Sequence, residues 1–121
     1  MPTINEVIER VDKIKPCSYG DKEKARWLME LEGKLFLEVL QGEGEFPPSR
    51  FPEDGGKPLI AEFPYDNIYD LYLQAMIDFH NREIQNYNNS MTMYAVALDE
   101  FKRWYRRSHM PRSANGFRNV L

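Results

Sequence analysis

The chain has 121 residues, and its 16 Lys and Arg against 19 Asp and Glu give a formal net charge of −3. This length suits one domain and is too short for a two-domain dehydrogenase, a kinase or a (β/α)8 barrel. A single cysteine, Cys17, excludes an internal disulfide, and two histidines, His80 and His109, disfavour a metal centre. No apolar run could span a membrane and no secretory signal is visible, so we expect an intracellular protein.

The charges are distributed unevenly along the chain. Residues 1–100 hold 10 basic and 19 acidic groups, a net charge of −9, whereas residues 101–121 hold 6 basic and no acidic groups. A basic terminal segment beside an acidic body indicates docking on something negative. The candidates are nucleic acid, a partner protein and the acidic body of a neighbouring copy.

The first predicted helix begins at Thr3, which stands three residues before Glu6 in the spacing of a capping box. Apolar residues then recur every three or four positions from Ile4 to Ile14, which is typical of one buried helix face. Pro16 ends this helix, because the residue before a proline is pushed out of the helical region. Residues 17–20 are expected to form a turn.

A second helix is predicted from an N-cap at Asp21 to a stop at Gly42. Its apolar positions are Ala25, Trp27, Leu28, Met29, Leu31, Leu35, Phe36, Leu37, Val39 and Leu40. They cover more than the one face that a single packing contact requires. This width fits either a helix that is buried on several sides or a helix at a subunit interface.

The segment that follows the second helix differs in composition from the rest of the chain. Residues 42–58 contain four glycines and four prolines, so we expect a long loop there. Such a loop in a small domain is usually functional or mobile. Phe46 and Phe51 lie among its prolines, so we expect the loop either to fold back on the domain or to dock on a partner. Residues 59–63 are expected to be a short extended stretch with no strand partner in the chain.

A third helix is predicted after an N-cap at Asp66, with a buried side formed by Ile68, Leu71, Tyr72, Ala75, Met76 and Phe79. Asparagines favour local backbone bonds over helix, so we expect a break or tight turn within residues 81–89. A fourth helix is predicted from about Ser90 to Arg107. Its packing seam consists of Tyr87, Met91, Tyr94, Leu98, Phe101 and Tyr105, while Met93, Val96 and Trp104 point elsewhere.

The expected fold is therefore all-α, a small bundle of three to four helices with one long Gly/Pro-rich loop. Residues 1–108 form the helical domain, which includes the loop at 42–58. Residues 109–121 form a basic C-terminal tail, which Pro111 and Gly116 mark as flexible.

The sequence contains no recognisable catalytic or metal-binding constellation. Asp78, His80 and Glu83 are the most metal-like group, but di-iron bundles need two Glu-x-x-His pairs and two further glutamates. Cys17 lacks the sequence context of a catalytic nucleophile. The glutamates of residues 42–45 would repel a phosphate. We therefore expect a protein that is not an enzyme and needs no cofactor.

Aromatic residues make up 13% of the chain, and several lie outside the expected core stripes. Aromatic and arginine side chains are enriched at protein interfaces. The interface candidates of these types are Trp27, Phe36, Phe46, Phe51, Trp104, Tyr105, Arg106, Arg107, Arg112, Phe117 and Arg118. The aromatic ones could equally fill the core of a small domain. Residues 102–107 also suit nucleic acid, but the acidic body favours docking on protein.

Two parts of the chain form a wider pattern of packing residues. The first comprises Lys15-Pro16 and Lys24-Ala25-Arg26-Trp27-Leu28-Met29-Glu30-Leu31-Glu32-Gly33. The second comprises Pro64-Tyr65-Asp66, Tyr69, Tyr72-Leu73, Ile77-Asp78, Glu83, Tyr87-Asn88-Asn89-Ser90-Met91, Phe101 and Trp104-Tyr105-Arg106-Arg107. This pattern resembles the head–tail connector (adaptor) proteins of tailed bacteriophages. The resemblance covers nearly the whole chain except the Gly/Pro-rich loop and the extreme tail.

The resemblance implies a small helical phage or prophage subunit that forms a ring under the portal of the DNA-filled capsid. Such a ring extends the DNA channel and provides the surface on which head-closure and tail proteins assemble. It implies a structural virion protein at the head–tail junction, assembled in the bacterial cytoplasm, with no enzymatic activity, cofactor or membrane contact. DNA passes without specific binding, because an acidic wall repels phosphates. The alternative is a small DNA-binding regulatory protein that uses the basic C-terminus.

Overall fold

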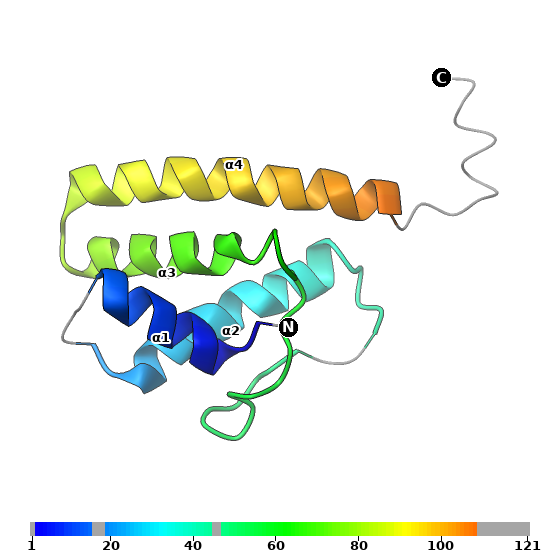
Figure 1. The fold of residues 1–121 in the computed structure, drawn as a ribbon, viewed down its shortest axis with the longest axis horizontal. Coiled ribbons are helices and arrows are strands. Elements are labelled where there is room, and N and C mark those ends of the chain that lie inside the picture. Colours follow the sequence, from blue (N-terminus) through cyan, green and yellow to red (C-terminus); the bar gives the residue numbers. More distant parts are fainter. Residues whose placement is uncertain (1, 16–18, 45–46, 109–121) are drawn as a thin grey trace.

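The computed structural model describes residues 2–15, 19–44 and 47–108, which form four α-helices. These are α1 (Ile4–Ile14), α2 (Asp21–Glu38), α3 (Asn67–His80) and α4 (Ile84–Ser108). α3 lies in the middle, with α4 along one side and α1 and α2 on the other (Figure 1). The described residues contain no strand, only an isolated bridge between Thr3 and Pro58. The expected all-α architecture is confirmed for this part of the chain.

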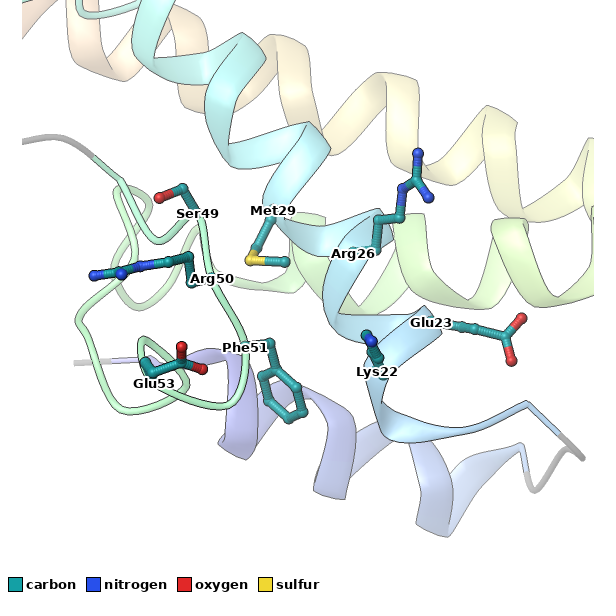
Figure 2. Close-up of a pocket in the computed structure, with 8 residues that line it drawn as sticks. All are labelled: Lys22, Glu23, Arg26, Met29, Ser49, Arg50, Phe51 and Glu53. Atoms are coloured by element: carbon teal, nitrogen blue, oxygen red, sulfur yellow. The ribbon is translucent and has the colours of Figure 1, made fainter.

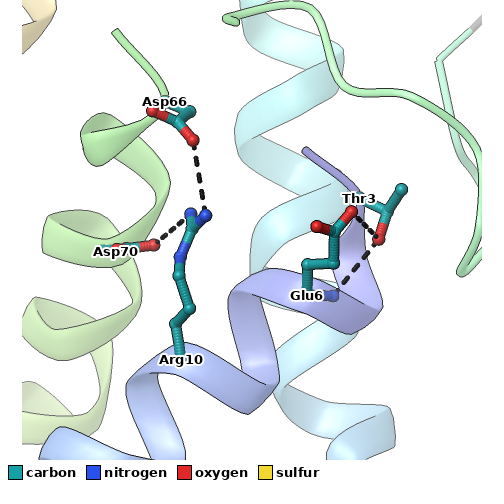
Figure 3. A network of polar contacts seen from close by, with 5 residues as sticks. All are labelled: Thr3, Glu6, Arg10, Asp66 and Asp70. Carbon is teal, nitrogen blue, oxygen red and sulfur yellow. Dashed lines mark hydrogen bonds and ion pairs between the residues drawn. The ribbon is translucent and has the colours of Figure 1, made fainter. Parts of the chain in front are cut away.

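α1 begins as the sequence predicts. Thr3 is its N-cap, and the Thr3 hydroxyl accepts a hydrogen bond from the Glu6 backbone N–H at 3.2 Å (Figure 3). The buried residues of α1 are Ile4, Val7, Ile8 and Val11, which form the single apolar face expected from their spacing. Ile14, the last residue expected on that face, is 64% exposed, so its assignment is wrong.

Both ends of α2 differ from the prediction. Gly20 is the N-cap, and Asp21 is the first helical residue, where its carboxylate lies near the positive end of the helix dipole. The helix ends at Glu38 rather than at Gly42. Gly42 has a φ of 80° and its N–H donates to the Phe36 carbonyl at 2.9 Å. This bond satisfies a carbonyl of the last helical turn, so Gly42 belongs to the turn that caps the end of the helix.

The described part of the Gly/Pro-rich loop forms turns that fold back on α1. Asp54 organises them, because its Oδ2 accepts the backbone N–H of Ser49 at 3.0 Å and of Arg50 at 3.1 Å. The Gly55 carbonyl accepts the Asn5 N–H at 3.1 Å. A Cβ at Gly55 would lie 2.7 Å from the end of the exposed Asn5 side chain, which would have to move aside to make room for it.

The extended stretch after the loop has a pairing partner that the sequence analysis did not find. The Leu59 N–H donates to the Pro2 carbonyl at 2.9 Å, next to the bridge between Thr3 and Pro58. Residues 59–63 therefore form no strand, as expected, but Leu59 is bonded to the first residues of the chain.

A buried carboxylate holds this stretch against α2. Glu32 is fully buried, its Oε2 accepts the Ile60 N–H at 2.6 Å, and its Oε1 accepts the Tyr69 hydroxyl at 2.7 Å. The Tyr69 oxygen in turn accepts the Ala61 N–H at 2.9 Å. Burial raises the pKa of Glu32 to about 7 although both hydrogen bonds oppose the shift. Glu32 and Tyr69 thus tie α2, α3 and residues 60–61 together.

α3 is buried on more sides than predicted. Of the residues expected to be buried, Ile68 and Ala75 are buried, whereas Phe79 is 50% exposed, so its assignment is wrong. The fully buried residues of α3 also include Tyr69, Leu73, Ile77 and Asp78. Because α1, α2 and α4 all contact α3, no single stripe of spacing three and four describes its buried surface.

α4 begins at Ile84 rather than near Ser90, so the expected start of this helix is wrong. The tight turn expected within residues 81–89 is present at residues 81–83, where Arg82 has a φ of 62°. Tyr87 packs against Phe79 with ring centroids 5.3 Å apart, and this contact favours helix at its neighbours. Tertiary packing outweighs the weak helix propensity of three exposed residues, Asn86, Asn88 and Asn89.

We expect Glu32→Gln to remove part of the pH dependence of folding stability. The pKa of Glu32 is raised from 4.5 to about 7 on folding, so the folded chain holds a proton that the unfolded chain has released. The contribution of Glu32 to the free energy of unfolding is therefore largest below the unfolded pKa of 4.5. It falls by about 3 kcal/mol as the pH rises from there to about 7. The free energy of unfolding of Glu32→Gln, measured by urea unfolding, should therefore fall less across this pH range than that of the wild-type chain.

The matched control is Glu30→Gln, because Glu30 is exposed on the same helix. This control should keep the wild-type pH dependence. The assignment to Glu32 is wrong if Glu32→Gln and the wild-type chain lose equal stability over the same pH range.

Candidate functional site

The interface candidates near the end of α4 surround an aromatic stack. Trp104 is half-buried and stacks on Tyr65, with ring centroids 5.2 Å apart and an angle of 29° between the planes. Phe101 is fully buried, with its centroid 6.1 Å from both rings. Tyr105 is half-buried beside Phe101. Trp104 therefore packs on the segment before α3, whereas the sequence analysis placed it away from the packing seam.

Cations lie on the same two turns of α4 as the aromatic residues of this stack. Arg106 and Arg107 are exposed on the last turns of α4, and Lys102 is half-buried one turn earlier. Arg103 pairs with Asp99 at 3.2 Å on the helix surface, where such a pair contributes little stability. Positive charges at this end of a helix interact favourably with its dipole. The end of α4 thus combines exposed arginines with partly exposed aromatic rings.

An ion-pair network fixes the segment on which Trp104 stacks. Arg10 on α1 donates to Asp66 at 3.3 Å and to Asp70 at 2.8 Å (Figure 3). Asp66 is the predicted N-cap of α3, but its side chain bonds to Arg10 and makes no capping bond. Burial raises the pKa of Asp70, although Arg10 opposes this shift. The network therefore holds Tyr65, the residue next to Asp66, in position.

The two candidates on α2 are core residues within this chain. Trp27 is 8% exposed, and its ring lies parallel to His80 with centroids 4.8 Å apart. Phe36 is 6% exposed. Internal packing therefore accounts for most of the apolar width of α2. Leu37 is the exception, because it is 68% exposed.

Phe51 lies at a cavity between the Gly/Pro-rich loop and the first half of α2 (Figure 2). The cavity has a volume of about 510 Å³, and Met29 and Phe51 supply its apolar lining. Its polar lining consists of Lys22, Glu23, Arg26, Ser49, Arg50 and Glu53. Charges of both signs are present, so the lining does not favour a ligand of one charge. Phe46, Arg112, Phe117 and Arg118, the other candidates, lie outside the described residues.

The three side chains of the metal-like group have separate partners. Asp78 is buried and pairs with Lys15 at 2.6 Å, while His80 stacks on Trp27 and Glu83 accepts from Asn86 at 3.1 Å. Among the residues that the structure describes, no three His, Cys, Asp or Glu side chains gather as they would around a metal ion. Cys17 lies outside those residues. None of the four helices has the length and apolar character needed to cross a membrane.

Several charged residues that the structure buries were not predicted from the sequence. Glu32 and Asp78 are fully buried, and Lys24 is 3% exposed with its ammonium 2.6 Å from Asp12. One signal was available for Glu32, since it stands four residues after Leu28 within the apolar stripe of α2. A charged residue at a core position needs a hydrogen-bond or ion-pair partner, but its position in the sequence does not identify that partner.

Comparison of this chain with protein-family models, with curated proteins and with solved structures finds no match. The role of the site is therefore inferred from the chemistry of the side chains described above. Arginine recognises carboxylates and phosphates, and aromatic rings pack against apolar surfaces. The end of α4 is suited to recognition of a negatively charged surface.

We expect Trp27→Ala to lower the free energy of unfolding by about 3–5 kcal/mol, because it leaves a cavity and removes the stack with His80. Urea unfolding followed by circular dichroism measures this loss. Arg107→Ala is the control, and its effect should stay within about 0.5 kcal/mol because Arg107 is exposed. Equal stability of the two variants would contradict the assignment of Trp27 to the core.

Proposed function

We propose that this chain is a structural subunit of a phage or prophage head–tail connector. It assembles as a ring beneath the portal, extends the DNA channel and presents a surface for head-closure and tail proteins. The observation that best supports this proposal is that several residues of the connector-like pattern are buried on α3 and α4. Its buried members on these helices include Tyr69, Leu73, Ile77, Asp78 and Phe101.

The charge distribution supports the same proposal. The net charge of −9 on residues 1–100 repels DNA phosphates, so DNA slides past without the tight binding that releases counterions. The exposed Arg106 and Arg107 suit an acidic surface of the portal or of a neighbouring copy. The subunit acts through assembly at the head–tail junction, with no catalytic step and no cofactor.

Electron microscopy of the purified chain with its cognate portal tests this proposal. We expect ring-shaped density on the portal and co-sedimentation of the two proteins. Arg107→Glu should weaken portal binding at least about tenfold, because it removes one favourable charge contact and adds a repulsive one. Lys13→Glu is the control, because Lys13 is an exposed cation of α1, and it should bind as the wild type does. Absence of both a ring and portal binding at high protein concentration would overturn the proposal.

The alternative is a small DNA-binding regulatory protein that uses the basic C-terminus. The exposure of Arg106 and Arg107 beside the half-buried Trp104 favours it, since such groups grip phosphates and stack on bases. This alternative requires DNA affinity that falls steeply between about 50 and 200 mM salt. A mobility-shift assay at low ionic strength separates the two functions, because a connector subunit should shift no DNA.

A further inference from the structure

Residues 59–65 form a strap that leads from the Gly/Pro-rich loop into the turn before α3 (Figure 1). Leu59 and Ala61 at its start are buried, whereas residues 62–64 in its middle are exposed. Phe63 is 85% exposed, so its ring contributes little packing that would hold the strap in place. The strap is therefore attached to the domain at its start and, through the half-buried Tyr65, at its end.

The attachment at the start of the strap depends on two side chains of other elements. The Ile60 N–H donates to Glu32 Oε2 at 2.6 Å, and the Ala61 N–H donates to the Tyr69 hydroxyl oxygen at 2.9 Å. Glu32 and Tyr69 are joined to each other at 2.7 Å. Two successive backbone groups of the strap thus depend on one carboxyl–phenol pair, and a change at Glu32 alters the hold on both.

Glu32 is a fully buried carboxyl group without a cation. Within the described part of the chain, no Lys, Arg or His forms an ion pair with it. An unpaired carboxylate in an apolar interior is unfavourable, so the closed strap favours the neutral form of Glu32. An open strap admits water, which solvates the carboxylate. The ionised form of Glu32 therefore favours the open strap.

The groups that surround Glu32 do not titrate with it. Burial, together with the charge of Glu32, raises the pKa of Tyr69 well above its usual value of 10, so Tyr69 stays neutral while Glu32 changes charge. The carboxylate of the strap itself, Glu62, is exposed. Cations of α1 and α2 are bonded to other carboxylates: Arg10 to Asp66 and Asp70, Lys15 to Asp78, and Lys24 to Asp12.

We propose that ionisation of Glu32 releases the strap, which makes residues 59–65 a proton-controlled latch between α2 and the aromatic stack at the end of α4. The four helices stay folded when the strap opens. Because Trp104 stacks on Tyr65, release of the strap also loosens the support of that stack. The latch works in the neutral range, since burial raises the pKa of Glu32 to about 7 in the closed strap. The latch does not depend on the connector function proposed above.

Amide hydrogen exchange measured by NMR tests the latch. The amides of residues 59–61 should exchange at least about tenfold faster than those of Leu73 and Ile77 in the buried part of α3, because the strap opens without global unfolding. After correction for the intrinsic pH dependence of exchange, the opening constant of the strap should rise about 70-fold from pH 5 to pH 8. This rise follows from a pKa of about 7 in the closed strap and 4.5 in the open one.

Glu32→Gln should abolish this rise, with an opening constant that stays within about twofold over the same pH range. The substituted amide can accept from the Ile60 N–H and donate to the Tyr69 oxygen, as a neutral carboxyl group does, so the variant should fold. The control is Glu30→Gln on the exposed side of the same helix, and it should keep the full rise. A rise that persists in Glu32→Gln overturns the assignment to Glu32.

The wild-type chain alone also tests the latch. If residues 59–61 exchange no faster than Leu73 and Ile77, the strap opens only by global unfolding, and the latch is overturned. The indole N–H signal of Trp104 reports the effect on the stack. It should shift with a midpoint near pH 7 in the wild-type chain and in Glu30→Gln, and it should stay constant in Glu32→Gln. A Trp104 signal that is equally constant in all three chains overturns the link between the strap and the stack.

Discussion

The contact between Glu32 and the segment before α3 is the constraint on which the rest of the structure depends. An isolated carboxylate in an apolar interior is so unfavourable that it must keep its hydrogen-bond donors. Those donors are the Ile60 N–H and the Tyr69 hydroxyl, so residues 60–61 and the first turn of α3 are fixed relative to α2. Tyr65 lies in the segment between residues 60–61 and Tyr69, so its position is fixed as well. Trp104 of α4 stacks on Tyr65, and this contact fixes the position of α4 in turn.

Charged contacts from α1 complete this framework. Arg10 reaches Asp70 near the start of α3, and Lys15 reaches Asp78 near its end, so α1 is fastened to α3 at two points. Lys24 links α2 to α1 through its bond to Asp12. These pairs are partly buried and are therefore screened less by salt than surface pairs. They gather α1, α2 and the described part of the loop on one side of α3, which leaves the outer side of α4 without a neighbour among the described helices.

Local patterns predicted the features that local interactions determine, such as the cap at Thr3 and the apolar face of α1. The start of α4 was missed because the contact of Tyr87 with Phe79, and not asparagine propensity, decides it. The partners of Glu32 stand 28 and 37 residues away, so spacing could not reveal them. Trp27 became an interface candidate because an apolar side chain on a wide helix face has the same signature in a core and at an interface.

The pairing of α3 with α4 also bears on the order in which the chain folds. These helices are joined by a turn of three residues, so their contacts close only short loops. Arg10 and Asp70, by contrast, are 60 residues apart, and bringing them together costs more chain entropy. Local contacts form faster than distant ones. We therefore expect the α3–α4 hairpin to form first, although it is the last described part of the chain to leave the ribosome. The earlier helices, α1 and α2, then pack on it.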